Sequence, residues 1–260
     1  MMPDPVQPTA DTIQGPGNLR RYGSAVFRQL RWLFTWIGWH NAGVLVALLI
    51  VILAIWAFTA LVGNVVAGDT LPFDEWAVRS LRRENDLSKP VGPDWLAEIS
   101  RDLTALGGVA FLSLLTFVVV GYLWLRKMYG AMWLVLLATS GGVLASTLLK
   151  NVIDRPRPNV VPHLSMVYTS SFPSGHSMLA AVVYVTLGSL LGRFVPQRPL
   201  KAYFLLVGLL LTFLVGVSRV YMGVHYPTDV LAGWAAGLAW ALICGLIARF
   251  LECRGAIHET

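Results

Sequence analysis

The run AGVLVALLIVILAIWAFTALVG, residues 42–63, contains no charged side chain. At about 1.5 Å per residue, a helix of this length reaches roughly 33 Å, enough to cross the hydrocarbon core of a bilayer. This pattern predicts an all-α, polytopic membrane protein with six transmembrane helices in one bundle and short external surface helices. The five other predicted spans are residues 108–125, 131–149, 177–191, 202–217 and 230–247.

The composition supports the same class. The 260 residues are 56% hydrophobic and only 13% charged, whereas soluble domains carry about 25% charged residues. The net charge of +6 is typical of cytoplasmic loops that face anionic lipid. Because no basic run is interleaved with aromatic residues, we expect membrane lipids as partners and no nucleic acid.

The chain divides into three predicted parts. Residues 1–18, rich in proline and glycine, predict a disordered N-terminal tail. Residues 19–41 combine arginines with tryptophans and leucines, which favours an interfacial amphipathic segment. Residues 42–251 form the predicted six-span domain. Its external segment, residues 64–107, holds eight acidic and five basic residues, as expected outside the cytoplasm.

The loop charges predict the orientation. Basic residues follow the second and fourth spans, so these ends and both termini are expected in the cytoplasm. The segments after the third and fifth spans then emerge together on the opposite, external side. Within the last span, Gly233 and Gly237 form a Gly-x-x-x-Gly pair, which predicts a close approach to another helix.

Three clusters of reactive residues lie in those two external segments. Lys150 and Arg157 form the first, and arginine between two prolines suits recognition of phosphate oxygens. Ser174, Gly175 and His176 form the second, at a predicted helix start whose free backbone N–H groups favour an anion.

The third cluster is Arg219, His225 and Asp229. A carboxylate four residues from a histidine can hold one imidazole N–H, which leaves the other nitrogen as a nucleophile or base. If Lys150, Arg157 and Arg219 gather within about 6 Å, each pair repels by roughly 3 kcal/mol at an effective dielectric near 20. A bound phosphate would offset this repulsion, so the clusters predict a phosphate site.

Lys-x6-Arg-Pro, Pro-Ser-Gly-His and Ser-Arg-x5-His-x3-Asp occur in this order, with eleven matching positions between Lys150 and Asp229. They resemble the three signature motifs of the type 2 phosphatidic acid phosphatase superfamily. The resemblance implies that His225 attacks phosphorus, that Asp229 orients His225, and that His176 protonates the leaving oxygen. It also implies phosphate binding by five further motif positions, Lys150, Arg157, Ser174, Gly175 and Arg219. It implies no metal and no cofactor.

The expected function is a membrane-embedded phosphatase that hydrolyses a lipid phosphate or diphosphate through a phosphohistidine. The preferred substrate is undecaprenyl diphosphate, converted to undecaprenyl phosphate at the outer face of a bacterial inner (plasma) membrane, with the site facing the periplasm or exterior. The alternatives are a phosphatidylglycerophosphate or phosphatidic acid phosphatase, and a lipid phosphotransferase that uses the same phosphohistidine. The sequence leaves the lipid and the oligomeric state open.

Overall fold

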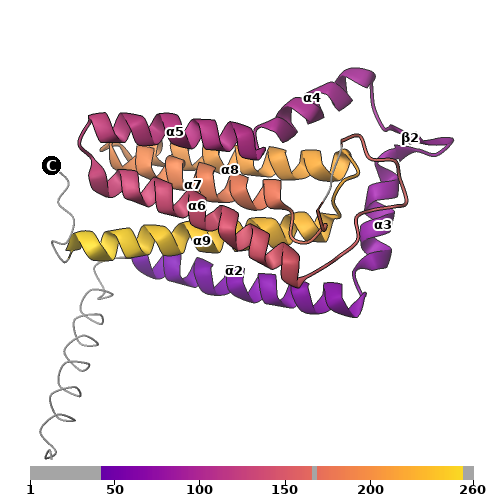
Figure 1. Cartoon of the computed structure of the whole chain (residues 1–260), viewed down its shortest axis with the longest axis horizontal. Coiled ribbons are helices and arrows are strands. Elements are labelled where there is room, and N and C mark those ends of the chain that lie inside the picture. The colour runs from indigo at the N-terminus through magenta and orange to yellow at the C-terminus, as the bar shows by residue number, and fades with distance from the viewer. Residues whose placement is uncertain (1–41, 166–168, 254–260) are drawn as a thin grey trace, which may run out of the picture. The chain divides into compact units, whose positions relative to one another are not determined.

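The computed structural model describes residues 42–165 and 169–253 (Figure 1). The chain divides into two units between Val46 and Ala47, and the candidate site belongs to the second. The predictions for residues 1–18 and 19–41 lie outside the described residues. The elements are α2 (Ala42–Ala67), α3 (Leu71–Ser80), β1 (Arg82–Arg83), β2 (Asp86–Pro90), α4 (Asp94–Ala105), α5 (Val109–Leu125), α6 (Tyr129–Val152), α7 (Gly175–Arg193), α8 (Arg198–Tyr221) and α9 (Pro227–Cys253).

The predicted all-α membrane fold is confirmed. In the described part of the chain, α2, α6, α7, α8 and α9 are each long and apolar enough to cross a membrane. Helices α4 and α5 pass the same test only as a pair, and they are bent by 47° relative to each other. Counting this bent pair as one span gives six spans. Large apolar side chains lie exposed on these helices, for example Phe117, Leu148 and Leu206, as expected for surfaces that face lipid.

Helix α7 is the most buried of the candidate spans, and it packs against α5, α6, α8 and α9. The close approach predicted for Gly233 and Gly237 is confirmed. A Cβ added at Gly237 would lie 2.4 Å from the carbonyl oxygen of Met178, and one at Gly233 would lie 2.7 Å from that of Ser174. Without a hydrophobic driving force in lipid, such small-residue contacts hold helices together. The contact aligns the first turns of α7 and α9.

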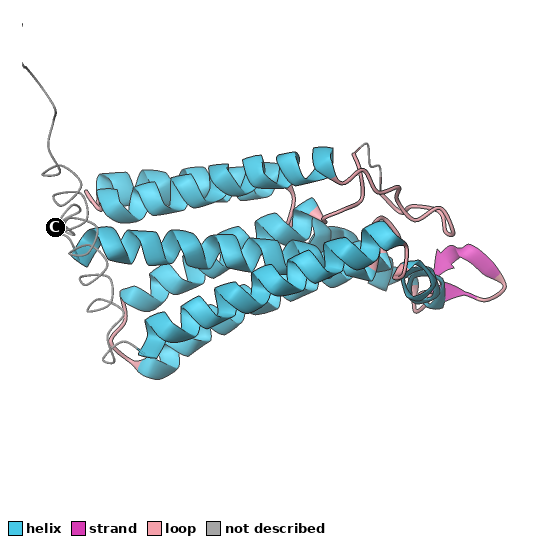
Figure 2. Cartoon of the chain, turned by 90° about the horizontal axis from the view of Figure 1, so that it is seen from below, coloured by secondary structure: helices cyan, strands magenta, loops and turns pink. Residues whose placement is uncertain are grey.

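The external segment contains the two short helices α3 and α4, as expected, together with an antiparallel β1–β2 hairpin that the sequence did not predict. Figure 2 shows the hairpin at one end of the long helices. Helix α3 is more than a surface helix. Its Asp74 and Val78 are completely buried, whereas Phe73 and Trp76 are exposed. The external segment therefore buries a carboxylate, that of Asp74, against the bundle.

Candidate active site

The three sequence clusters meet at the end of the bundle that carries α3 and the hairpin (Figure 1). Residues from the ends of α4, α6 and α8, from the starts of α5 and α7 and from the loops before α7 and α9 line a cavity of about 400 Å³. Six of the predicted site residues line it, from elements up to 75 residues apart: Lys150, Arg157, Gly175, His176, Arg219 and His225. The other two, Ser174 and Asp229, are fully buried and do not line the cavity.

The contacts of Arg157 determine the tautomer of His225. One guanidinium nitrogen, Nη1, lies 3.2 Å from His225 Nε2 and donates to the carbonyl of Val224 at 2.7 Å. Because a guanidinium only donates hydrogen bonds, Nε2 must be the acceptor, and the ring proton is on Nδ1. The unprotonated nitrogen therefore lies beside Arg157, which lines the same cavity as His225 and could also bind a phosphate oxygen.

The other ring nitrogen faces Asp229 and Ser171. His225 Nδ1 lies 3.3 Å from Ser171 Oγ and 3.5 Å from Asp229 Oδ2. Ser171 donates its own hydroxyl hydrogen to Asp229 Oδ2, and the backbone N–H of Tyr226 donates to the same oxygen at 2.9 Å. The Nδ1–H group thus points at a serine hydroxyl and a carboxylate that act as one acceptor pair.

Burial dominates the electrostatics of the histidine. His225 is 1% exposed, and this desolvation lowers its pKa to about 3, although the nearby Asp229 opposes the shift. A buried imidazole loses the hydration that its charged form needs. The ring is therefore neutral at physiological pH, and its Nε2 carries no proton.

Lys150 and Arg219 supply the remaining cavity cations. The ammonium of Lys150 donates to the carbonyl of Ser170 at 2.7 Å. Gly175 leaves room for this side chain, since an added Cβ would lie 3.3 Å from Lys150 Cε. Arg219 is 2% exposed, and its Nε has no hydrogen-bond partner among the described residues. An anion in the cavity would satisfy such a buried donor.

Helix α7 begins at the cavity. Ser174 is its N-cap residue, with extended backbone angles, and its hydroxyl does not cap the helix. Instead the Ser174 hydroxyl oxygen accepts a hydrogen bond from the Ser177 hydroxyl at 2.9 Å. The hydroxyl hydrogen of Ser174 is not used in that bond and could be donated to an anion. His176 follows in the first turn and lines the cavity. The open helix start and its dipole favour an anion in front of it.

Sequence reasoning missed a second layer of polar residues behind the cavity. Arg155 Nη1 pairs with Asp229 Oδ1 at 2.6 Å, and Nη2 pairs with Asp74 Oδ2 at 2.7 Å. Thr228 contacts both Arg155 and Asp74. Arg155 has a weak sequence signal, because it stands two positions before Arg157 in the same proline-rich stretch. Asp74 has none, since it is one of eight acids in the external segment.

A second missed contact supports Arg219. The hydroxyl of Thr104, at the end of α4, lies 2.7 Å from the Ser218 hydroxyl and 3.5 Å from Arg219 Nη1. Thr104 also lines the cavity. The external segment therefore reaches the site through two buried polar side chains, Asp74 and Thr104.

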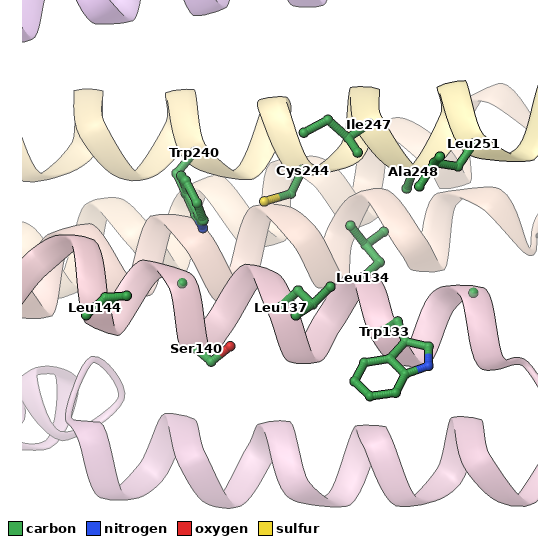
Figure 3. A pocket seen from close by; sticks show the side chains of 12 residues that line it. Trp133, Leu134, Leu137, Ser140, Leu144, Trp240, Cys244, Ile247, Ala248 and Leu251 are labelled. Carbon is green, nitrogen blue, oxygen red and sulfur yellow. The ribbon is translucent and has the colours of Figure 1, made fainter.

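An apolar groove of about 500 Å³ lies farther along the bundle, between α6 and α9. In Figure 3, Trp240 and Cys244 point from α9 toward α6, and Leu134 lies between the two helices. None of the twelve described residues that line it is charged. It offers an anion no cationic partner, unlike the cavity around His225.

Comparisons with known proteins point to one protein family. The family profile described as the PAP2 superfamily matches residues 130–251. Phosphatidylglycerophosphatase B of Bacillus subtilis is 39% identical over 149 residues, which are 55% of this chain and 71% of that protein. An undecaprenyl-diphosphatase of Sulfolobus acidocaldarius is 40% identical over 67 residues, 26% of this chain and 28% of that protein.

A solved structure shares the fold. The crystal structure of a transmembrane PAP2-type phosphatidylglycerolphosphate phosphatase from Bacillus subtilis superposes with a TM-score of 0.69 at 29% identity. The match covers 77% of this chain and 96% of that one. With the helical membrane bundle and the convergence of the three motifs, these likenesses establish that the chain is a membrane-embedded member of the PAP2 superfamily.

Proposed function

We propose that this protein hydrolyses a lipid phosphate by forming a phosphohistidine at His225. The observation that carries the proposal is the tautomer of His225. Its Nε2 accepts from Arg157, His225 lines one cavity with Lys150, Arg157 and Arg219, and its Nδ1–H is held by Ser171 and Asp229. A neutral, oriented imidazole facing a cluster of cations is suited to attack a phosphate.

In the first step, the phosphate oxygens replace Nε2 as partners of Arg157 and receive hydrogen bonds from Lys150, Arg219 and the start of α7. Nε2 attacks phosphorus, and the bond from phosphorus to the lipid oxygen breaks. His176 donates a proton to that leaving oxygen. Positive charge develops on the His225 ring, and the carboxylate of Asp229 stabilises it.

In the second step, His176 removes a proton from a water molecule, and the resulting hydroxide attacks phosphorus. The phosphorus–nitrogen bond breaks, inorganic phosphate leaves and His225 returns to its neutral form. The cations of the cavity supply the charge stabilisation throughout, so no metal ion is needed in this scheme. Transfer to a lipid hydroxyl instead of water would make the protein a phosphotransferase.

We propose phosphatidylglycerophosphate as the preferred substrate, because the relative named for it aligns over 71% of its own length. Undecaprenyl diphosphate is the second candidate. The similarity to the Sulfolobus undecaprenyl-diphosphatase reaches 40% identity over 67 residues, and a diphosphate would also suit several cations in one cavity.

The test is phosphate release by the purified full-length chain in detergent. Phosphatidylglycerophosphate, undecaprenyl diphosphate and phosphatidic acid are compared at equal surface concentration, with His225→Ala as the matched inactive variant. We expect the highest kcat/KM on phosphatidylglycerophosphate and no turnover above background for His225→Ala. Normal activity of His225→Ala would refute the nucleophile, whereas a different substrate order would change only the lipid. Radiolabelled phosphate appearing on an added alcohol would indicate phosphotransfer.

We also propose that the cavity faces the outside of a bacterial plasma membrane and that both termini are cytoplasmic. Arg126 and Lys127 lie between α5 and α6, and Arg193 is the last residue of α7. These positions are at the helix ends opposite the cavity, and cytoplasmic ends of spans are enriched in such residues. Cys253, an exposed free thiol at the end of α9, provides the test. A membrane-impermeant thiol reagent should label it only after the cells are permeabilised, and labelling of intact cells would contradict this orientation.

A further inference from the structure

A continuous chain of buried ionic contacts joins the external segment to His225. Asp74 on α3 pairs with Arg155, Arg155 pairs with Asp229, and Asp229 faces the imidazole. Both carboxylates are completely buried, and Arg155 is 9% exposed. Although burial opposes its charge, the two carboxylates raise the pKa of Arg155 above the ordinary value. The guanidinium is therefore a fixed positive charge between two negative ones.

The contacts divide the oxygens of Asp229 between two tasks. Oδ1 is held by Arg155 at 2.6 Å, whereas Oδ2 receives Ser171 and the Tyr226 N–H and faces His225. A carboxylate anchored at one oxygen cannot rotate without breaking a buried ion pair. The Arg155 contact thus keeps Oδ2 directed at the histidine.

Arg155 is itself held on several sides. Its Nη2 pairs with Asp74, its Nη1 donates to Thr228 Oγ1 at 2.8 Å, and its guanidinium carbon lies 4.4 Å from the Tyr226 ring centre. Asp74 in turn accepts bonds from the Thr228 N–H and hydroxyl. Helix α3 is thereby fastened to the first turn of α9, the turn that carries Asp229.

The charge balance has a chemical consequence. One guanidinium between two carboxylates leaves the Asp74–Arg155–Asp229 group with a net negative charge. Without Asp74, the whole charge of Arg155 would act on Asp229 and weaken its attraction for the Nδ1–H group. That attraction matters most in the transition state, when positive charge develops on the ring.

We propose that Asp74 and Arg155 are positioning residues for catalysis, which hold Asp229 in place and preserve its negative charge toward His225. The inference rests on the proposed roles of His225 and Asp229. It assigns a function to the external segment, which supplies Asp74 from outside the three signature motifs. Neither residue lines the cavity, so both act through Asp229 rather than on the substrate.

The test compares Asp74→Asn with Glu75→Gln in the purified full-length chain, on the lipid that the wild type turns over fastest. Both changes convert a carboxylate of α3 to an amide, but Glu75 is partly exposed and pairs only loosely with Arg79, at 3.7 Å. We expect Asp74→Asn to lower kcat by about tenfold to a hundredfold, as removal of a supporting hydrogen-bond partner commonly does, while KM stays within about twofold. Glu75→Gln should match the wild type.

A double-mutant cycle separates positioning from general damage. In an Asp229→Asn background, Asp74→Asn should cause no further loss of kcat, because the group through which it acts is already changed. An equal loss in both backgrounds, or a loss confined to KM, would overturn the proposal. If Asp74→Asn does not yield folded protein, Thr228→Val takes its place in the same cycle, since it removes the hydroxyl that contacts both Arg155 and Asp74.

His225→Ala in the same preparation distinguishes this proposal from the proposed function. An inactive His225→Ala together with a fully active Asp74→Asn would refute only the positioning role. Activity in His225→Ala would refute the nucleophile, and the role of Asp74 with it.

Discussion

The contact between α7 and α9 makes Gly237 the most informative position for testing how packing sets the site geometry. A Cβ at this position would lie 2.4 Å from the Met178 carbonyl oxygen and 2.7 Å from Ala181 Cβ. Real Cβ atoms essentially never come closer than 3.0 Å to such neighbours, so Gly237→Ala must move the two helices apart by at least about 0.6 Å. The obstacle is backbone, which cannot change rotamer to make room.

We expect this substitution to reduce both stability and turnover. Overpacking of this kind costs about 1–3 kcal/mol, which lowers the Tm by several degrees. Because His176 lies at the start of α7 and Asp229 at the start of α9, the separation also disturbs the catalytic geometry. A displacement of about 1 Å can cost about a hundredfold in rate, so a shift of 0.6 Å or more should lower kcat by about tenfold.

Gly245→Ala is the matched control on the same helix. No atom lies within 4 Å of the Cβ that it would add, and alanine favours a helix over glycine by up to about 1 kcal/mol. In thermal unfolding in detergent, Gly237→Ala should therefore lower the Tm and Gly245→Ala should raise it. Only Gly237→Ala should lose turnover. A Gly237→Ala protein with wild-type Tm and kcat would show that α7 and α9 are not in backbone contact there.

Two further predictions concern pH and metal ions. Since burial lowers the pKa of His225 to about 3, its ring should stay neutral as the pH falls through 6.5, and nitrogen NMR of labelled histidine, with His225→Gln for assignment, should show no titration near that value. In the unfolded chain the pKa of His225 returns to about 6.5, so between pH 6.5 and pH 3 the unfolded state binds the proton and the folded state does not. The contribution of His225 to folding stability is therefore full above about pH 6.5 and is lost as the pH falls toward 3. A His225 signal that titrates near 6.5 would contradict both statements. Phosphate release should persist after exhaustive treatment with a chelator, because Lys150, Arg157 and Arg219 carry the charge stabilisation, and activity restored only by added Mg²⁺ would contradict the proposed scheme.

Much of the site could be predicted because its residues are encoded locally. Lys150 and Arg157 are seven positions apart, and His225 and Asp229 are four apart, so each motif is already ordered by one helix end and its adjoining loop. The apolar runs likewise predict spans, since a helix is the only single segment that satisfies its own backbone in lipid. Alternation of the spans then predicts that the motifs emerge at the same end of the bundle.

The residues that contact these motif side chains depend on tertiary packing and could not be predicted from local sequence. Ser171 stands between His225 and Asp229 only because the loop before α7 folds against the start of α9. Asp74 meets Arg155 across 81 residues of sequence, and Thr104 meets Ser218 across 114. A buried ion pair of this kind depends on how α3 and α4 dock on the bundle, and no local pattern distinguishes Asp74 from its exposed neighbours.

The linear order of residues thus specifies the membrane spans and the reactive groups, because helix length and motif spacing are local properties. The tertiary structure decides which nitrogen of His225 accepts from Arg157 and which acid is joined to Asp229 through Arg155. Those outcomes depend on hydrogen bonds and charges that only the packed helices bring within reach, and the small residues of α9 let them approach that closely.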